Sequence, residues 1–437
     1  MTPGLIIAAP ASGSGKTVVA AGVLRALRRR GLRVASFKVG PDYIDPAFHA
    51  AATGRDCLNL DAWGMRPQTL RALAARLADD AELVLGEGVM GLFDGTPEGS
   101  GSTADLAALT GWPVVLVVDV ARQAASAGAV VRGFATHRPD VTLAGVVFNR
   151  VGGPSHAQTL RRASAPLEGV RVLGFVPRDA RLNLPERHLG LVQAAEHEEL
   201  EQFLDGAAEV MAGSIDLDAV AGLARPSVLG PGPRPAAPLP PLGSRIAIAR
   251  DQAFAFCYPA TAEGWRVAGT DLSFFSPLAD EAPERGADAV YLPGGYPELH
   301  AGRLAANRRF VEGLRTAARR GAAVYGECGG YMVLGEGLTD EDGTRHPMAG
   351  LLPLETSFAE RRLHLGYRRL KLSVTGPLGH RGGAFRGHEF HYASVVREGV
   401  LPLFHRHDAA GAALGSAGSV EGRVMGSFVH LIDRADP

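Results

Sequence analysis

The segment LIIAAPASGSGKT, residues 5–17, decides the fold of the first half of the chain. An apolar run leads into a glycine-rich loop that ends in Gly-Lys-Thr, and residues 18–31, VVAAGVLRALRRRG, then have the pattern of an amphipathic helix. A strand, a loop and a helix in this order form a phosphate-binding loop, because the loop N–H groups and the positive end of the helix both attract phosphate oxygens. The full motif begins with glycine where this chain has Pro10. We expect ATP to contact Ser12, Gly13, Ser14, Gly15, Lys16 and Thr17, with the Thr17 hydroxyl on magnesium (Mg²⁺).

Apolar runs without polar alternation recur through the first half of the sequence, at residues 32–39, 81–89, 112–120, 143–149 and 170–177. Such runs predict strands that are buried on both faces of a parallel sheet. Because helix-length segments separate them, the sequence predicts an α/β fold.

Residues 226–243, PSVLGPGPRPAAPLPPLG, are rich in proline and glycine, which neither continue a helix nor join the interior of a sheet. We predict a linker there. Beyond it the alternation of strand and helix starts again, and shorter strands follow towards the C-terminus. The sequence therefore predicts two α/β domains, residues 1–225 and 244–437, as the length of 437 residues also favours.

The composition argues against several classes of protein. The formal net charge is -1 and no block of one sign stands out, which disfavours a basic nucleic-acid-binding face. The apolar runs are too short to span a bilayer, and the N-terminus has no basic leader. Three scattered cysteines, Cys57, Cys257 and Cys328, indicate reduced thiols rather than disulfides. We expect a cytoplasmic protein without nucleic-acid or membrane partners.

Polar residues follow several predicted strands of the first domain. Glu87 comes just after an apolar run, where a second magnesium-coordinating carboxylate would lie, and Asp94 follows in a glycine-flanked turn. Asn149 ends another run, at the edge where open α/β sheets bind ligands, and base recognition is one role for it. The segment FKVGPDYIDP, residues 37–46, also follows a strand, and its prolines are expected to keep it from becoming helix. Its candidate site residues are Lys38, which we expect to contact ATP, and Asp42, Tyr43 and Asp45. The alternative is that these side chains form turns in solvated loops.

The second domain carries a cysteine on a predicted sharp turn, in GECGGYM, residues 326–332. Gly326 and Gly330 take the flanking positions of a nucleophile elbow between a buried strand and a helix. We expect an exposed Cys328 thiol whose pKa is lowered by the start of the helix. The alternative is a small buried core residue, which free cysteine often is.

A thiol nucleophile needs a base and donors for the oxyanion that forms. His430 ends an apolar run near the C-terminus, and His388 and His391 in GHEFHY are alternative bases. The predicted oxyanion donors are the N–H groups of Gly294, Gly295 and Gly329.

These motifs together resemble the cobyrinic acid or hydrogenobyrinic acid a,c-diamide synthases of cobalamin biosynthesis. The resemblance covers nearly the whole chain and rests on APASGSGKT, FKVGPDYIDP, GEGVMGLFDG, LPGGYPE, GECGGYM, GHEFHY and SFVH, of which FKVGPDYIDP is the most specific. It implies a dethiobiotin synthetase-like, ATP-binding amidoligase domain over residues 1–225. It also implies a class I (triad) glutamine amidotransferase domain over residues 244–437.

The resemblance further implies the activity and its residues. The a and c acetate carboxylates of a corrinoid (tetrapyrrole) polycarboxylate would be amidated with ATP and glutamine, through an acyl phosphate and ammonia released by a cysteine nucleophile. It implies that Cys328 is this nucleophile and His430 its base. Metal ligands would be Thr17, Asp45 and Glu87, and substrate contacts would come from Asp42, Tyr43, Asp45 and Asp94. Class I amidotransferases usually have a glutamate two residues after the histidine, where this chain has Ile432.

Two other functions fit the same motifs. One is the amidation of a nickel sirohydrochlorin-type tetrapyrrole. The other is a nucleotide-switched ATPase with an inactive amidotransferase-like domain, although such a domain has no reason to keep the thiol of Cys328. The sequence leaves open whether the substrate carries cobalt and whether the enzyme is a homodimer.

Overall fold

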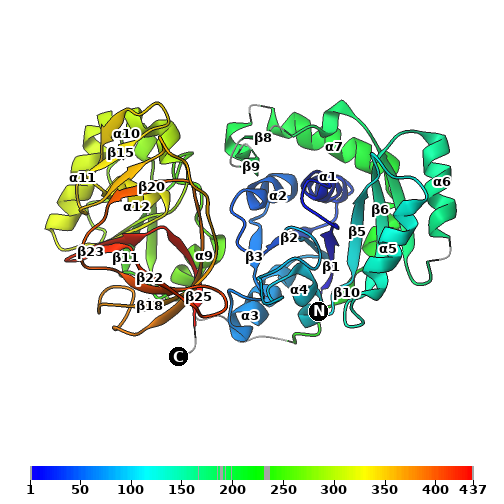
Figure 1. Ribbon diagram of the computed structural model, residues 1–437, viewed down its shortest axis with the longest axis horizontal. Helices are drawn as coiled ribbons and strands as arrows, with labels where there is room; N and C mark the ends of the chain where they lie inside the picture. Colours follow the sequence, from blue (N-terminus) through cyan, green and yellow to red (C-terminus); the bar gives the residue numbers. More distant parts are fainter. Residues whose placement is uncertain are drawn as a thin grey trace. The chain divides into compact units, whose positions relative to one another are not determined.

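The computed structural model describes residues 2–165, 167–184, 186–187, 190–191, 193–197, 199–230 and 237–435. The chain forms two compact units, residues 1–63 with 70–234 and residues 64–69 with 235–437 (Figure 1). The early segment 64–69 was not expected in the second unit. Residues 231–236 of the predicted linker lie outside the described part of the chain.

The first unit is built on a parallel sheet with the strand order β3-β2-β4-β1-β5-β6-β7, and β10 pairs antiparallel with β1 (Figure 1). Each predicted apolar run is a strand of this sheet, because a strand inside a parallel sheet is covered on both faces. The strands are β1 (Pro3–Ala8), β2 (Val34–Val39), β3 (Leu58–Leu60), β4 (Leu83–Glu87), β5 (Val114–Asp119), β6 (Leu143–Val151), β7 (Arg171–Pro177), β10 (Arg225–Pro226) and the separate pair β8 (Glu186–Arg187) and β9 (Gly190–Leu191).

Helices connect these strands and cover the sheet. Apolar side chains of α1 and α7, such as Val23 and Met211, form one core with Leu5 and Leu85 of the sheet. The helices are α1 (Lys16–Arg29), α2 (Asp45–Thr53), α3 (Pro67–Ala78), α4 (Thr103–Thr110), α5 (Ser126–Thr136), α6 (Pro154–Ser164), α7 (Leu200–Ser214) and α8 (Leu217–Leu223), with 3-10 turns η1 (Ala180–Leu182) and η2 (Ala194–Glu196).

The expectation that two prolines keep residues 37–46 out of a helix is wrong at the end of the segment. Helix α2 begins at Asp45, and Pro46 lies in its first turn. Proline is tolerated there because the first N–H groups of a helix have no partner within the helix. Asp45 is therefore presented from the first turn of a helix rather than from a loop.

The second unit combines a mainly parallel sheet of order β12-β11-β13-β14-β24-β23, an antiparallel sheet of order β22-β21-β18-β19-β25 and a small mixed sheet of order β16-β15-β17-β20. Its strands are β11 (Arg245–Ala249), β12 (Asp271–Phe275), β13 (Ala289–Leu292), β14 (Ala323–Glu327), β15 (Gly337–Thr339), β16 (Arg345–Pro347), β17 (Glu355–Ser357), β18 (His364–Leu372), β19 (Ala384–His391), β20 (Ser394–Arg397), β21 (Phe404–His407), β22 (Ala413–Ala417), β23 (Ser419–Glu421), β24 (Val424–Ser427) and β25 (Val429–Arg434). Its helices are α9 (Pro259–Val267), α10 (Ala301–Ala306), α11 (Arg308–Arg319) and α12 (Gly329–Leu334), with 3-10 turns η3 (Pro277–Ala279) and η4 (Pro297–His300).

The parallel sheet of the second unit separates two cores. Val290 and Val324 pack with the helices of one core, which includes Leu314 of α11 and Met332 of α12. Tyr291 and Tyr325, the next residues along the same strands, face the other core, which includes apolar residues of the antiparallel sheet. This alternation follows from the two-residue repeat of a strand.

The C-terminal segment GRVMGSFVHLID supplies strands to both large sheets. β24 runs parallel to β14, whereas β25 pairs antiparallel with β19. Phe428 lies between the two strands, and the Ser427 hydroxyl accepts a hydrogen bond from the Val429 N–H at 3.2 Å. Because the chain changes sheets at Phe428, His430 lies on β25 of the antiparallel sheet, whereas the preceding strand β24 pairs with β14.

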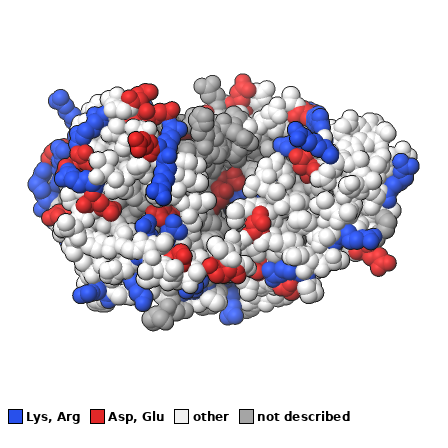
Figure 2. All heavy atoms as spheres, viewed as in Figure 1, with Lys and Arg blue, Asp and Glu red and all other residues white. Residues whose placement is uncertain are grey.

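Basic and acidic side chains alternate over the face drawn in Figure 2, where the described residues form no broad area of one sign. Among the described helices, none is long and apolar enough to cross a membrane.

Candidate functional site

The glycine-rich loop of residues 10–15 connects β1 to α1. Gly13 and Gly15 have φ angles of 75° and 84°, which side chains other than glycine rarely adopt. The Ser14 hydroxyl donates to the Ala11 carbonyl at 2.8 Å, and a Cβ on Gly15 would lie 2.3 Å from Nδ2 of Asn149. Glycine at residue 15 is thus required by conformation and by space.

Asn149, in β6, holds the glycine-rich loop by a hydrogen bond to its backbone. Its Nδ2 donates to the Ser14 carbonyl at 2.9 Å, and its Oδ1 accepts the Arg150 N–H at 2.9 Å. Both the nitrogen and the oxygen of this side-chain amide form hydrogen bonds with backbone groups, so Asn149 stabilises the conformation of the loop. The prediction of a contact with the base gains no support from this geometry.

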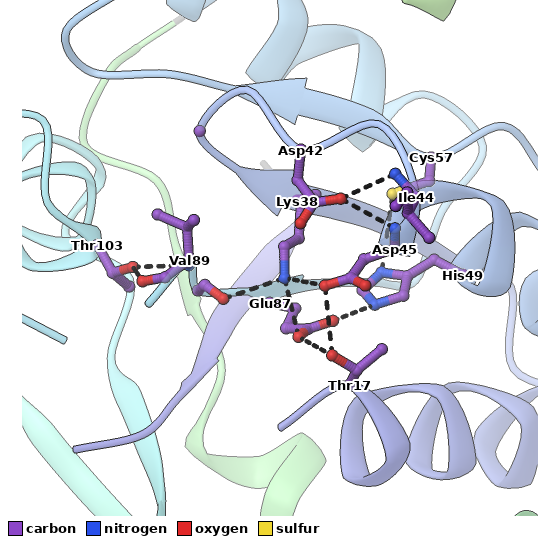
Figure 3. A network of polar contacts seen from close by, with 12 residues as sticks. Thr17, Lys38, Asp42, Ile44, Asp45, His49, Cys57, Glu87, Val89 and Thr103 are labelled. Atoms are coloured by element: carbon purple, nitrogen blue, oxygen red, sulfur yellow. Dashed lines mark hydrogen bonds and ion pairs between the residues drawn. The ribbon is translucent and has the colours of Figure 1, made fainter. Parts of the chain in front are cut away.

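The predicted polar residues behind the loop form one network (Figure 3). The Thr17 hydroxyl lies 2.7 Å from Glu87 Oε1 and 3.3 Å from Asp45 Oδ2. Lys38 Nζ lies 2.5 Å from Asp45 Oδ2 and 2.9 Å from Glu87 Oε1, and it donates to the Gly88 carbonyl at 3.2 Å. The ends of β2 and β4 and the first turns of α1 and α2 therefore bring Thr17, Lys38, Asp45 and Glu87 together.

Burial and pairing set the charges of this network. Burial alone would lower the pKa of Lys38, but Asp45 and Glu87 outweigh it and hold that pKa above its usual range. Burial would likewise raise the pKa of Glu87, but Lys38 and His49 keep that pKa well below its ordinary value. Burial and Asp42 raise the pKa of Asp45 to about 7 against the pull of Lys38. Burial also lowers the pKa of Lys16.

His49 is a member of the network that the sequence did not predict. Its Nε2 lies 2.8 Å from Glu87 Oε2, and its Nδ1 lies 3.7 Å from Cys57 Sγ (Figure 3). Burial would lower the pKa of His49, but Cys57 and Glu87 raise it to about 10. Its place four residues after Asp45 was the available signal, because residues four apart share one face of a helix.

Oxygen donors of this set fit magnesium. Mg²⁺ prefers oxygen ligands and is commonly held by one or two carboxylates together with substrate phosphates and water. Thr17, Asp45 and Glu87 present a hydroxyl and two carboxylates to each other, and Lys38 lies between the two carboxylates. Over the described residues, no group of three or more His, Cys, Asp or Glu side chains is arranged to hold a metal ion.

The other predicted substrate contacts lie at or near this network. Asp42 Oδ1 accepts the N–H groups of Ile44 and Asp45 at 2.9 and 3.0 Å, which is the turn-forming role of aspartate. Tyr43 is half-buried. Asp94 is exposed, and its Oδ2 accepts the Gly91 N–H at 2.8 Å. Roles of these residues in substrate binding stay predictions.

Cys328 lies on a sharp turn between β14 and α12, as expected, with a φ of 47° and a ψ of −108°. A Cβ on Gly330 would lie 2.0 Å from the Leu292 carbonyl oxygen, which explains the glycine at that flank. The expected exposure is wrong, because Cys328 is only 4% exposed. The expected lowering of its pKa is also wrong, since burial and then Glu298 raise the pKa of this thiol. Helix α12 has six residues, and its short dipole does not offset desolvation.

His430 lies beside Cys328, which no spacing in the sequence could show. A Cβ on Gly294 would be 2.3 Å from His430 Cε1, 3.1 Å from His430 Nε2 and 3.2 Å from Cys328 Cβ. Burial, with smaller effects of His388 and His391, lowers the pKa of His430 to about 3. At neutral pH the pair is therefore a thiol and a neutral imidazole.

Two of the predicted oxyanion donors belong to segments in close contact, since a Cβ on Gly329 would lie 3.1 Å from the Gly295 nitrogen. Their role as oxyanion donors stays a prediction. The alternative base His391 stacks on Phe428 at 3.9 Å and lies 3.4 Å from Glu389 Oε1. His388 packs edge-on against Tyr367.

Two carboxylates near Cys328 were missed, of which Glu327 is buried and Glu298 half-buried. Glu298 follows the Gly294–Gly295 pair, and burial raises its pKa to about 8. Glu327 directly precedes Cys328, and its Oε2 lies 4.0 Å from His430 Nδ1. Asp433, by contrast, is bound by Arg66, whose Nη2 lies 2.8 Å from Asp433 Oδ1. One feature of the sequence could have indicated Glu327 and Glu298. Each is a carboxylate in an otherwise apolar or glycine-rich segment, where an acidic residue is unusual unless it has a partner.

Comparison with known proteins matches both halves of the chain. Residues 5–192 match the CobQ/CobB/MinD/ParA nucleotide binding domain, and residues 245–437 match the CobB/CobQ-like glutamine amidotransferase domain. A hydrogenobyrinate a,c-diamide synthase of Brucella anthropi is 57% identical over 98% of this chain and 98% of its own. Proteins of the same name from Sinorhizobium sp and Rhodobacter capsulatus are 55% and 54% identical, over 99% and 98% of both chains.

Proposed function

The chain belongs to the family of hydrogenobyrinate a,c-diamide synthases, and we propose from this premise that it amidates the a and c acetate carboxylates of hydrogenobyrinic acid with ATP and glutamine. It is a glutamine-dependent amidating ligase with a nucleotide-binding domain. One observation carries the proposal: proteins named hydrogenobyrinate a,c-diamide synthase match this chain over nearly its full length, through both its nucleotide-binding domain and its glutamine amidotransferase domain.

The first unit supplies the activation that a carboxylate needs. A carboxylate does not react with ammonia, because oxide or hydroxide would have to leave, whereas its mixed anhydride with phosphate reacts readily. In the proposal Lys16 and the loop N–H groups bind the ATP phosphates, and transfer of the γ-phosphoryl group gives an acyl phosphate. Thr17, Asp45 and Glu87 would hold magnesium, which neutralises phosphate charge. Lys38 pairs with both carboxylates and lowers the pKa of Glu87, and together with Lys16 it would stabilise the charge that spreads over the transferred phosphoryl group.

The substrate-binding part of the proposal rests on the neighbouring loop. Asp42, Tyr43, Asp45 and Asp94 lie on segments that follow β2 and β4, at the carboxyl ends of the strands, where open α/β sheets bind ligands. These side chains would position the acetate group of the macrocycle beside the ATP phosphates.

The second unit supplies ammonia. His430 would take the proton of Cys328, whose sulfur attacks the carboxamide carbon of glutamine. The N–H groups of Gly295 and Gly329 would stabilise the oxyanion, and ammonia leaves with the proton from His430. Water then hydrolyses the thioester to glutamate. Two amidations would consume two ATP and two glutamine.

Products identified by mass spectrometry test the substrate. Incubation with hydrogenobyrinic acid, ATP, magnesium and glutamine should give a mass gain of two amidations, with less product from cobyrinic acid and none from nickel sirohydrochlorin. A diamide formed from nickel sirohydrochlorin alone would overturn the substrate assignment. Nucleotide hydrolysis without any amide would favour a switch ATPase.

A Cys328→Ser variant tests the division of labour between the units. It should lose amidation with glutamine and keep amidation with ammonium salts, because serine is not activated by a neutral, buried histidine to the same extent. Loss of both activities with an intact fold would contradict the separation.

A further inference from the structure

We propose that Glu327, the residue before the nucleophile, is the positioning residue that orients His430 and balances the charge on its imidazolium during glutamine cleavage. This inference rests on the proposed function for the role of Cys328 and His430. The GECGGYM motif and its spacing indicate Cys328 but not Glu327. Consecutive side chains of a strand point to opposite faces, so Glu327 is not expected from the sequence to act on the same histidine as Cys328.

Glu327 lies in the second core of the unit, on the face opposite to its neighbour Cys328. It ends β14, and Tyr325, two residues earlier, lies on the same face. Its Oε1 accepts the Tyr325 hydroxyl at 2.9 Å, and its Oε2 accepts the Tyr291 hydroxyl at 2.8 Å. The residue is 1% exposed. A carboxylate is rarely buried to this extent unless a partner requires it.

The carboxylate also joins the two sheets at His430. Its Oε1 accepts the N–H of Leu431 at 3.1 Å, and its Oε2 lies 4.0 Å from Nδ1 of His430. β14 belongs to the parallel sheet and β25 to the antiparallel sheet, so no backbone ladder pairs these two strands. Glu327 therefore fixes the backbone beside His430 and faces its ring from the same position.

The two ring nitrogens of His430 face different partners. Nε2 lies on the side of Gly294 and Cys328, whereas Nδ1 lies on the side of Glu327. When the Sγ proton of Cys328 moves to Nε2, the ring gains a positive charge and keeps its Nδ1–H towards the carboxylate. The S–C bond then forms, the C–N bond of the carboxamide breaks, and the Nε2 proton leaves with the nitrogen as ammonia. Glu327 does not exchange a proton in these steps.

The other acidic residue near His430 along β25 has a different partner. Asp433 is fully buried against Arg66, which donates to it through its backbone N–H at 2.9 Å and through its guanidinium. Ile432 is apolar and buried. In class I amidotransferases this carboxylate usually comes from a glutamate two residues after the histidine, where this chain has Ile432. Here Glu327 at the end of β14 takes that place.

Burial raises the pKa of Glu327 to about 7, while the Leu431 N–H and the two tyrosine hydroxyls oppose the rise. The ionised fraction of this carboxylate therefore grows as pH rises through neutrality. The titratable groups that face Glu327 or His430 are Tyr291, Tyr325, Cys257, Cys328, His388 and His391.

The test compares Glu327→Gln with Glu327→Asp and the wild type in glutaminase assays from pH 6 to pH 9. Glutamine has nearly the same shape. Its amide oxygen can still accept the Tyr325 and Leu431 hydrogen bonds, and its NH2 group can donate to the Tyr291 oxygen once that hydroxyl rotates, so the substitution removes the charge and keeps the packing. We expect kcat for glutamine hydrolysis to fall at least about 100-fold in Glu327→Gln with KM nearly unchanged, and the acid limb of the pH profile to disappear. Partial recovery is expected in Glu327→Asp. Ammonia-supported amidation should stay within about 2-fold of wild type in every variant.

Two results would overturn the proposal. Glutaminase activity of Glu327→Gln within about 3-fold of wild type, with an unchanged pH profile, would mean that Glu327 only packs. Loss of both glutaminase and ammonia-supported activity would mean that it only maintains the fold. Tyr325→Phe, which removes one hydrogen bond to Glu327 and keeps the charge, is the matched control and should retain the acid limb. Because glutamine hydrolysis is assayed separately, a wrong macrocycle substrate would leave this test intact.

Discussion

Replacing Gly294 by alanine should abolish the use of glutamine while sparing amidation with free ammonia. An added Cβ would lie 2.3 Å from His430 Cε1, whereas ordinary contact begins near 3.4 Å. The backbone of Gly294 is held, because its carbonyl accepts the Phe256 N–H at 2.9 Å. The imidazole must therefore retreat by about 1 Å, since a packed core does not deform continuously.

The size of the effect follows from that displacement. Misplacing a catalytic group by about 1 Å costs about 100-fold in rate, which is about 2.7 kcal/mol of activation free energy. The new methyl group would also lie 3.2 Å from Cys328 Cβ, which adds crowding at the nucleophile. We expect glutaminase kcat to fall at least about 100-fold.

The assay measures glutamate release and ammonia-supported amide formation on the same preparation. Gly376→Ala is the matched control, because a Cβ there has no atom within 4 Å, and it should leave both rates unchanged. A Gly294→Ala enzyme with glutaminase activity within about 3-fold of wild type would refute the assignment of His430 as the base. Thermal unfolding of both variants shows whether the fold is intact.

Gly15→Ala should weaken nucleotide binding at least about 10-fold, because its φ of 84° disfavours a side chain and its Cβ would lie 2.3 Å from Asn149 Nδ2; nucleotide titration by calorimetry checks this, and an unchanged affinity would contradict it. Alkylation of Cys328 by iodoacetamide in the absence of glutamine should be slow at pH 7 and still rising at pH 9, because burial raises the pKa of the thiol and so lowers its thiolate fraction at neutral pH. A plateau of that rate below pH 8 would show an activated thiolate instead. Arg66→Ala should lower the free energy of unfolding by about 3–5 kcal/mol, because it leaves the fully buried Asp433 carboxylate without its guanidinium partner. Denaturation by urea measures that loss, and a change below about 1 kcal/mol would mean that water replaces the guanidinium.

Local motifs were predictable because their chemistry lies within a few consecutive residues. The phosphate loop from Ser12 to Thr17 carries its glycines, lysine and threonine in one stretch, and the turn at Cys328 carries both flanking glycines. Each was found where the pattern placed it, between a strand and a helix. The apolar runs likewise predicted the parallel strands, since both faces of such a strand are buried.

Charge states and long-range neighbours could not be predicted in this way. Desolvation, which depends on every atom packed around a group, reversed the expected pKa shift of Cys328. His49 and Glu87, 38 residues apart in sequence, meet only because α2 packs at the end of β4.

By itself, then, the sequence determined which residues are able to do chemistry, the α/β class and the family. The pairing of Cys328 with His430 was already implied by the resemblance. Only the tertiary structure decided the other partners: Glu327 near Nδ1 of His430, His49 beside Glu87 and Lys38 between two carboxylates. The physical reason is that local pattern fixes the direction of a side chain on its own element, whereas its partners and its dielectric surroundings come from other elements that fold against it.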